Sequence, residues 1–279
     1  MAQTGKLYIV GTPIGNLQDM TFRAVETLKK VNLIAAEDTR HTGKLLQYFE
    51  VGTPQISYHH HNRLSRQNEL LEILFQGKDI ALVTDAGTPG ISDPGYELIR
   101  DCLEANIEVI PIPGVTAVIT ALSVSGLVTD KFVFEGFLST KDKYRKEKLQ
   151  ELQTENRTIV FYEAPHKLLD TLKDLAKYLG GERLIILGRE LTKLHEELWR
   201  GKLSEAVDIY ENGRQPKGEY TLVVEGDRSK QVIDLSDEEI KDELTKIMAG
   251  GVSRSQASKQ LAHLTKLPRR RLYEIALSI

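Results

Sequence analysis

The stretch that decides the fold is IALVTDAGTPGISDPGYELIRDCLEANIEVIPIPGVTA, residues 80–117. It holds two short apolar runs, residues 80–83 and 109–112, with a helix-like segment at residues 96–105 between them. A buried strand, a helix and a second buried strand in this order are typical of a βαβ unit, whose two strands run parallel. Ligands bind beyond the carboxyl ends of such strands, so the glycine- and proline-rich loops that follow them are the first place to look for a site.

The same alternation continues toward the N-terminus. Apolar runs predict strands at residues 6–10, 33–36 and 55–58. Helical spacing of apolar residues predicts helices at residues 21–31, 43–50 and 70–76. Alternating strands and helices indicate a mainly parallel sheet with helices on its faces. We therefore predict an N-terminal α/β domain over residues 1–117.

Beyond residue 117 the pattern changes. Strands are predicted at residues 132–137, 159–162, 184–187, 195–199 and 220–224, helices at residues 168–179 and 204–210, and residues 141–153 form a charged stretch. The later strands have hairpin-like spacing, which favours a mixed sheet. We predict a second α/β domain over residues 118–228, so the fold class is α/β with two domains and a small helical C-terminal extension.

The charge of the chain is distributed unevenly. The net charge is −3, from 37 Lys plus Arg and 40 Asp plus Glu. Residues 250–279 carry six basic side chains and one acidic side chain, a net charge of +5, which leaves −8 for the remainder. Residues 237–248, 253–264 and 269–277 have helical patterns. We therefore predict a basic, helix-turn-helix-like extension over residues 236–279 with a partner of its own; the alternative is a solvated helix surface.

Composition excludes several classes of protein. With 41% hydrophobic and 28% charged residues the chain is neither disordered nor collagen-like. Its single cysteine, Cys102, excludes an intrachain disulfide and a Cys-rich zinc site, and we expect it to be an inert core thiol. No apolar run approaches the roughly 20 residues of a membrane helix, and no signal peptide is visible at the start. We expect a soluble protein of a reducing compartment, the cytoplasm.

Three loops at strand ends are the candidate ligand sites. The first, GTPIGN at residues 11–16, lacks the glycine pattern of a dinucleotide fingerprint and the Gly-Lys-Ser/Thr of a phosphate-binding loop. The second, residues 84–95, is longer than a simple strand-to-helix turn and holds three glycines, which let backbone approach a ligand closely. The alternative is a structural loop in which Asp93 caps the next helix. In the third, residues 113–117, Thr116 either caps a helix or helps to place its N-terminus at a ligand.

Seven blocks, in this order, carry a resemblance to a known family: VGTPIGN, AEDTRHTGKLL, VTDAGTPGISDPG, IPGVTA, FYEAPHKL, RELTKLHEELWRG and KGEYTLVVEG. Together, over residues 5–226, they resemble the tetrapyrrole methylase superfamily of S-adenosylmethionine-dependent enzymes, and its ribosomal branch in particular. The resemblance implies two α/β domains with the cofactor in the cleft between them, and a homodimer. It also implies methyl transfer to the ribose 2′-hydroxyl of a cytidine in 16S rRNA, either as free rRNA or within the small ribosomal subunit.

The resemblance also implies a set of residues that contact S-adenosylmethionine. Carried over by position, they are Pro13, Ile14, Asp85, Ala86, Gly87, Gly90, Ile91, Thr116, Ala117, Tyr162, Glu163 and Leu191. Porphyrin-modifying members usually have Gly-x-Gly-Pro-Gly-Asp in the first loop and Gly-Gly-Asp-Pro in the second. Here the loops read Gly-Thr-Pro-Ile-Gly-Asn and Asp-Ala-Gly-Thr-Pro, which argues against a tetrapyrrole substrate.

Methyl transfer to a hydroxyl needs positioning and benefits from a base that takes the proton. Carboxylates at predicted strand ends are the candidates: Glu163 leads, and Asp38 and Glu190 follow. Candidate RNA-binding cations are Arg40, Arg189 and Lys217 near the site and Arg254, Lys259, Arg269, Arg270 and Arg271 in the extension. For each the alternative is a salt bridge or a helix cap. The reaction demands no metal, and the consecutive residues 59–61, all histidine, follow a strand and point to opposite faces, so we predict no metal site.

Two other functions remain open at this point. One is an enzyme of the same fold that acts on a tetrapyrrole or on a protein side chain. The other is a non-catalytic module that binds RNA or protein. The basic extension favours an RNA enzyme, because a small-molecule methylase has no need of phosphate-binding side chains.

Overall fold

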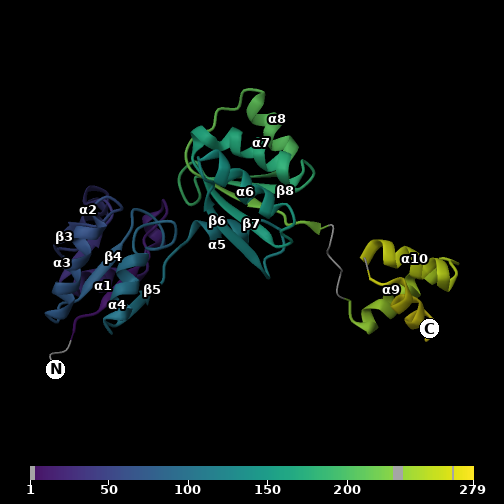
Figure 1. The fold of residues 1–279 in the computed structure, drawn as a ribbon, viewed down its shortest axis with the longest axis horizontal. Coiled ribbons are helices and arrows are strands. Elements are labelled where there is room, and N and C mark those ends of the chain that lie inside the picture. The colour runs from purple at the N-terminus through teal and green to yellow at the C-terminus, as the bar shows by residue number, and fades with distance from the viewer. Residues whose placement is uncertain (1–3, 229–234, 266) are drawn as a thin grey trace.

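The computed structural model describes residues 4–228, 235–265 and 267–279, and it contains two five-stranded sheets followed by a helical unit (Figure 1). The first sheet and its helices occupy the N-terminal part of the chain, and the second sheet follows in sequence. Among the described residues, no helix is both long and apolar enough to cross a membrane.

The first sheet is entirely parallel. Its strands are β1 (Leu7–Val10), β2 (Leu33–Ala36), β3 (Gln55–Ser57), β4 (Ile80–Val83) and β5 (Val109–Ile112), in the order β3-β2-β4-β1-β5. The helices between them are α1 (Phe22–Lys30), α2 (Thr39–Tyr48), α3 (Arg63–Phe75) and α4 (Tyr96–Glu104), and the short 3-10 helix η1 spans Leu17–Asp19. Along each strand successive side chains face opposite sides, so Leu82 packs with α3 and α4 while Ala81 and Val83 pack with α1 and α2. The predicted parallel α/β sheet is confirmed.

The second sheet is mixed, as predicted. Its strands are β6 (Phe132–Phe137), β7 (Thr158–Glu163), β8 (Leu184–Arg189), β9 (Glu197–Lys202) and β10 (Tyr220–Val224), in the order β6-β7-β10-β8-β9. Only β6 and β7 run parallel; the other neighbours are antiparallel. One face is covered by α6 (Asp142–Leu152), α7 (Leu168–Leu179) and α8 (Leu203–Glu211), and the 3-10 helix η2 (Pro165–Lys167) precedes α7.

Helix α5 (Ala117–Ser123) covers the opposite face of the second sheet (Figure 1). Val118 and Leu122 of this helix pack against Val160 and Val223 in the sheet. The same apolar cluster takes in Ile14 from the loop after β1 and Leu191 from the loop after β8. A buried contact therefore joins the N-terminal loops to the second sheet.

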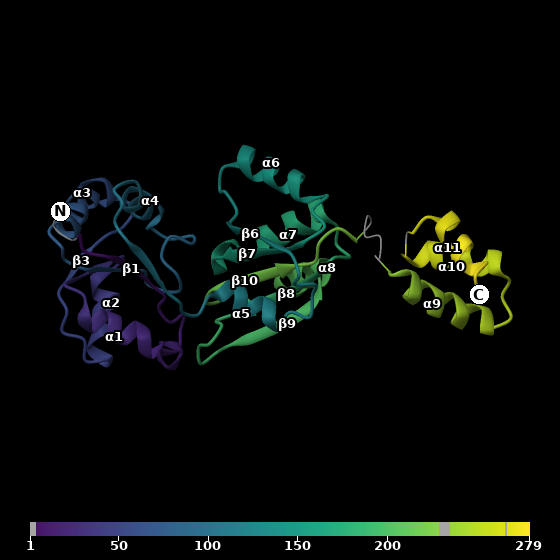
Figure 2. The ribbon, with the colours of Figure 1, turned by 90° about the horizontal axis from the view of Figure 1, so that it is seen from below.

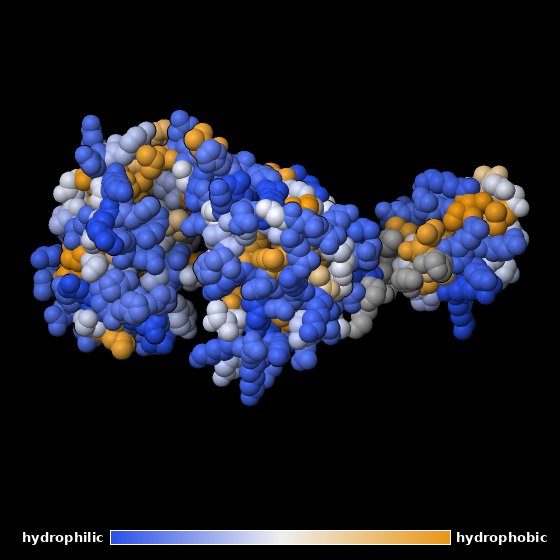
Figure 3. Space-filling view, turned by 90° about the horizontal axis from the view of Figure 1, so that it is seen from above, coloured by the Kyte–Doolittle hydropathy of each residue, from blue (hydrophilic) through white to orange (hydrophobic). Residues whose placement is uncertain are grey.

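The C-terminal helices form a unit with a core of its own. They are α9 (Asp237–Ala249), α10 (Arg254–Thr265) and α11 (Arg269–Ala276), and their buried residues include Ile240, Leu244, Leu261 and Leu272. Figures 1 and 2 show this unit at one end of the molecule, beyond the second sheet, and it forms a separate lobe in the space-filling view of Figure 3. The three predicted helices are confirmed.

Several element bounds differ from the predictions for physical reasons. Helix α2 begins four residues earlier than expected because Asp38 caps it, although its first turn is polar. Helix α3 begins at Arg63, seven residues early; its first turns are polar, and the residue they bury is Gln67, so apolar spacing marks only the later part of the helix. The charged stretch after β6 is helix α6, whose apolar face consists of little more than Leu149 and Leu152. The strand predicted at residues 195–199 is β9, which begins two residues later.

Candidate active site

The three predicted loops lie together because two contacts hold them. Thr12 and Gly87 exchange backbone hydrogen bonds of 2.8 and 3.1 Å, and the Thr12 hydroxyl donates to the Thr84 carbonyl at 3.1 Å. These bonds join the first loop to the second. A Cβ atom added to Gly11 would lie 2.8 Å from the Gly114 Cα, so only glycine permits the first and third loops to touch there. The carboxyl-end edge of the first sheet is thereby built from all three loops.

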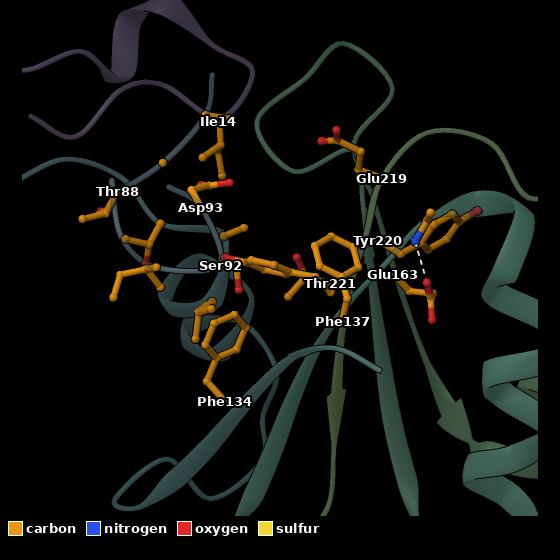
Figure 4. Close-up of a pocket in the computed structure, with 18 of the residues that line it drawn as sticks. Ile14, Thr88, Ser92, Asp93, Phe134, Phe137, Glu163, Glu219, Tyr220 and Thr221 are labelled. Atoms are coloured by element: carbon orange, nitrogen blue, oxygen red, sulfur yellow. Dashed lines mark hydrogen bonds between the residues drawn. The ribbon is translucent and has the colours of Figure 1, made fainter. Parts of the chain in front are cut away.

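This edge and the second sheet enclose a cavity of about 630 Å³ (Figure 4). Its loop side includes Ile14, Ser92 and Asp93, and its sheet side includes residues from β6, β7 and β10. The ring centroids of Phe134 and Phe137 lie 4.9 and 5.7 Å from that of Tyr162, which makes one wall aromatic. A concave, largely apolar cavity with a few polar groups is the usual form of a small-molecule site.

Most residues predicted to contact the cofactor line this cavity. They are Ile14, Ala86, Gly87, Ile91, Thr116, Ala117, Tyr162 and Glu163. The other four, Pro13, Asp85, Gly90 and Leu191, are not among its lining residues. Gly90 has φ +81° in the turn of the second loop, and Leu191 packs with Ile14 beneath the cavity. The Asp85 carboxylate accepts a hydrogen bond of 3.2 Å from the backbone N–H of Asp38.

Asp38, predicted as a candidate base, lies outside the cavity and is fully engaged. It is the N-cap of α2, and its carboxylate accepts a hydrogen bond of 2.8 Å from the Arg40 backbone N–H. The Arg40 guanidinium also binds it, at 2.7 Å. These bonds from Arg40 hold the pKa of Asp38 far below its ordinary value, so this carboxylate is a weak proton acceptor.

Glu163, the leading candidate, is among the residues that line the cavity, but its carboxylate is bound on the side of α7. Side chains alternate along β7, so Tyr162 belongs to the aromatic wall while the Glu163 carboxylate is on the opposite face, where it contacts Thr171 of α7. Glu163 is 3% exposed and accepts hydrogen bonds from the Ala164 N–H at 2.8 Å and the Thr171 hydroxyl at 2.5 Å. Arg145 in turn donates to Thr171 at 3.0 Å and to Asp174 at 2.6 Å. Glu163 therefore belongs to a buried network that fixes the end of β7.

Glu190, the third candidate, is also held by neighbours. Its carboxylate accepts bonds from the Lys193 ammonium at 3.0 Å and from the backbone N–H of Glu219 at 2.9 Å. Burial opposes its ionised form, but these two bonds together outweigh burial and lower the pKa of Glu190. Glu190 shapes the loop before β10 and does not line the cavity.

Asp93 is a carboxylate of the cavity wall that the sequence-based list of bases missed. The residue before α4 is Gly95 and no side chain caps that helix, so the alternative in which Asp93 caps it is wrong. Burial, and then the nearby carboxylates of Glu37 and Asp85, raise the pKa of Asp93 to about 7. Glu37 follows β2 and Asp85 follows β4, neighbouring strands of the first sheet, so this environment depends on residues far apart in the sequence.

The predicted RNA-binding cations fall into two groups. Near the site, Arg40 is paired with Asp38, Arg189 donates to the Lys217 carbonyl at 2.8 Å and contacts Glu197 at 3.3 Å, and the Lys217 side chain is exposed. In the C-terminal unit Arg270 pairs with Glu274, Arg271 pairs with Asp237, and Arg269 donates to the Ser255 hydroxyl at 2.9 Å. Arg254 and Lys259 are exposed and form no ion pair within the described part of the chain.

The described residues contain no cluster of three or more His, Cys, Asp or Glu side chains that would hold a metal ion. The rings of His59 and His61 lie edge to face, 5.9 Å apart. Cys102 is buried, and burial raises the pKa of its thiol to about 12, so it is unreactive, as predicted.

A parallel sheet whose strand-end loops meet a mixed sheet around an apolar cavity defines a class of methylase fold. The chain belongs to the tetrapyrrole (corrin/porphyrin) methylase family, whose model matches residues 6–207. Within that family, the protein from Synechocystis named ribosomal RNA small subunit methyltransferase I is 62% identical over 275 residues, covering 99% of this chain and 98% of that protein.

A second relative of the same name, from Thermotoga maritima, is 49% identical over 222 residues, which are 99% of its length and 80% of this chain. About a fifth of this chain therefore has no counterpart there. Among solved structures, uroporphyrin-III C-methyltransferase from Thermus thermophilus, complexed with S-adenyl homocysteine, has a TM-score of 0.58 at 16% identity, covering 79% of this chain and 97% of that chain. At 16% identity this similarity shows that the two proteins share a fold.

Proposed function

We propose that this protein is an S-adenosylmethionine-dependent rRNA methyltransferase that methylates the ribose 2′-hydroxyl of a 16S rRNA cytidine. The observation that carries the proposal is the cavity, because eight of the twelve residues expected to contact the cofactor line it. The substrate class is supported by the relatives named ribosomal RNA small subunit methyltransferase I, which match nearly the whole chain.

The residues of the cavity fit this cofactor. A volume of about 630 Å³ suits a ligand of nucleoside size with an amino-acid tail. The backbone around Gly87 and Thr116 would hold the polar amino-acid part, since Gly87 has no side chain there and the N-terminus of α5 begins just after Thr116. The aromatic wall, with Tyr162 at its centre, would hold the flat adenine part.

The cofactor, when bound, supplies an electrophilic methyl group: the bond from the ribose oxygen to that carbon forms while the carbon–sulfur bond breaks and sulfur keeps the electron pair. The protein must place the hydroxyl in line and exclude water, which is chiefly a task of positioning. The Gly11–Gly114 contact and the Thr12–Gly87 bonds make the loop side rigid for this purpose. The hydroxyl proton needs an acceptor in the same cavity.

We further propose that the C-terminal unit binds RNA phosphates through Arg254, Lys259, Arg269, Arg270 and Arg271. Arg254, Lys259 and Arg269 support this role best, because they are exposed and no carboxylate of the described chain neutralises them. The unit would add affinity for RNA, since its helices have a core of their own and none of their described residues lines the cavity. Near the cavity, Arg40, Arg189 and Lys217 are the proposed contacts.

The proposal includes the organisation of the protein. We place the domains at residues 1–117, 118–228 and 236–279, which is supported by the separate sheets and by the separate core of the C-terminal helices. We propose a cytoplasmic homodimer, as the family resemblance implies.

A methyl-transfer assay tests the proposal. Purified protein is incubated with radiolabelled S-adenosylmethionine and, in parallel, with small ribosomal subunits, naked 16S rRNA or uroporphyrinogen III. We expect label in ribosomal RNA, and mass spectrometry of nuclease fragments to place it on a cytidine ribose. Label in the tetrapyrrole alone, or on a base, would contradict the proposal.

A further inference from the structure

Several polar groups at the cavity could in principle accept a proton. Its titratable lining residues are Asp93, Tyr162, Glu163, His166, Glu219 and Tyr220. Methyl transfer to a hydroxyl, which rests on the function proposed above, requires one acceptor that is both directed at the cavity and not engaged elsewhere.

Most of these groups are engaged or poorly placed. Glu163 is buried under α7 with two donors, and Glu219 is largely exposed and bonded to Lys193 at 3.1 Å. The Tyr220 hydroxyl bonds to that of Tyr210 at 3.2 Å. His166 lies on the exposed turn of η2, at the rim of the cavity.

Asp93 is in a different situation. Within the described part of the chain no group donates a hydrogen bond to its carboxyl, and no cation pairs with it. Figure 4 shows the side chain beside Ile14, projecting from the loop side toward the strands opposite. The titratable groups that act on it are Glu37 after β2 and Asp85 in its own loop, while Asp93 itself acts on Tyr162 of β7, another residue of the cavity lining.

The loop that carries Asp93 is held tightly. The Gly90 N–H donates to the Pro94 carbonyl at 3.2 Å, which closes the turn around Asp93. A Cβ atom added to Gly95 would lie 3.0 Å from both the Gly90 nitrogen and Leu82, so the chain after Asp93 is fixed against β4. The backbone at Asp93 is therefore held in place, at the wall of the cavity.

We propose that Asp93 is the general base of the reaction, and that it accepts the proton of the ribose 2′-hydroxyl as the oxygen–methyl bond forms. The proton passes from the 2′-oxygen to a carboxylate oxygen of Asp93 and leaves to solvent after the product departs. Glu37 and Asp85 assist because their negative charges make Asp93 a stronger acceptor. Burial acts in the same direction, and with a pKa of about 7 the group is matched to work near neutral pH.

The test compares Asp93→Asn with the wild-type protein on small ribosomal subunits in single-turnover assays from pH 5.5 to 9. The matched control is Asp142→Asn, which makes the same chemical change at a side chain 88% exposed at the start of α6. His166→Gln is the rival variant. Cofactor affinity of each is measured by calorimetry with S-adenosylmethionine, and folding by circular dichroism.

We expect the methylation rate of the wild type, the control and the rival to rise with pH, to be half-maximal near pH 7 and to level off above about pH 8. For Asp93→Asn we expect a loss of at least about 100-fold, no such rise with pH, and unchanged cofactor affinity. We expect Asp93→Glu to recover part of the rate. Three results for Asp93→Asn would overturn the assignment: a rate within about threefold of wild type, a rate that still rises with pH, or loss of cofactor binding. The assignment would also be overturned if the rate of His166→Gln did not rise with pH.

Three further outcomes are decisive. If Asp93→Asn does not fold, a wild-type rate that is flat between pH 5.5 and 9 overturns the assignment. If the wild type labels no ribosomal RNA, the proposed function fails and the assignment fails with it. If the wild type labels RNA and Asp93→Asn does so equally well, only the assignment fails.

Discussion

The environment of Asp93 predicts a measurable dependence of stability on pH. The carboxyl has a pKa of about 7 in the folded protein and an ordinary value near 4 in the unfolded chain. Between these values the folded state holds a proton that the unfolded state releases, so the free energy of unfolding falls as pH rises from about 4 to about 7. Replacing Asp93 by Asn removes this dependence, because the amide does not ionise.

The size of the effect follows from the difference in pKa. Each pKa unit corresponds to about 1.4 kcal/mol, so the ionised Asp93 would lower the free energy of unfolding by at most about 4 kcal/mol at pH 8. Roughly half of that accrues between pH 5.5 and pH 8. Water reaches the half-buried carboxyl and screens its interactions, so we halve the change expected between pH 5.5 and pH 8, from about 2 to about 1 kcal/mol. We therefore expect the stabilisation by Asp93→Asn to be about 1 kcal/mol larger at pH 8 than at pH 5.5.

Urea unfolding followed by circular dichroism, without cofactor, measures this difference. The wild type, Asp93→Asn and the exposed control Asp142→Asn are unfolded at pH 5.5 and at pH 8 in the same ionic strength. The control should show no change between the two pH values relative to wild type. The reasoning is refuted if Asp93→Asn gains equally at both pH values, or gains more at pH 5.5, since neither result fits a carboxyl whose ionisation is opposed by folding.

Three further perturbations test the architecture. Gly114→Ala places a methyl group 2.9 Å from Gly11, so we expect cofactor affinity, measured by calorimetry, to fall about tenfold or more. Gly52→Ala is the neutral control, because a methyl group there meets open space. Equal affinities of the two variants would contradict the tight loop contact. Thr171→Val leaves the buried Glu163 carboxylate without its hydroxyl donor, and we expect chemical unfolding to show a loss of about 1–3 kcal/mol; a loss below about 0.5 kcal/mol would mean that the bond contributes little. Ending the chain at residue 235 should weaken rRNA binding and flatten its salt dependence, while cofactor affinity stays unchanged. If filter-binding assays gave equal salt slopes for the shortened and the full-length protein, an RNA role for the C-terminal unit would be contradicted.

The sequence was sufficient to predict the edge at which the site forms. Short apolar runs ended by glycine and proline marked β1, β4 and β5, and the rule for parallel sheets then brought their loops together. The mixed character of the second sheet was also predictable, from the hairpin-like spacing of its strands. These features depend on local pattern, which a single sequence contains.

The direction of individual side chains was harder to predict. Its place at a strand end makes Glu163 the predicted base, but the alternation along β7 puts its carboxylate on the side of α7 and leaves Tyr162 facing the cavity. That outcome was available from the period of a strand, once the face of one residue was known. Asp93 is a different case, since its properties depend on Glu37 and Asp85, which only the folded sheet brings near it.

The position of β10 has a consequence for how the protein is made. This strand, Tyr220–Val224, is the last of the second sheet to leave the ribosome, yet it lies between β7 and β8 and pairs with both. Until it emerges, the inner edges of those strands have no partner, whereas the first sheet is complete once Ile112 has been synthesised. The nascent chain thus folds its N-terminal half early and holds two open, apolar strand edges until late. A chain that terminates before Tyr220 would therefore have a complete first sheet but a second sheet without its central strand, with the unpaired edges of β7 and β8 open to aggregation.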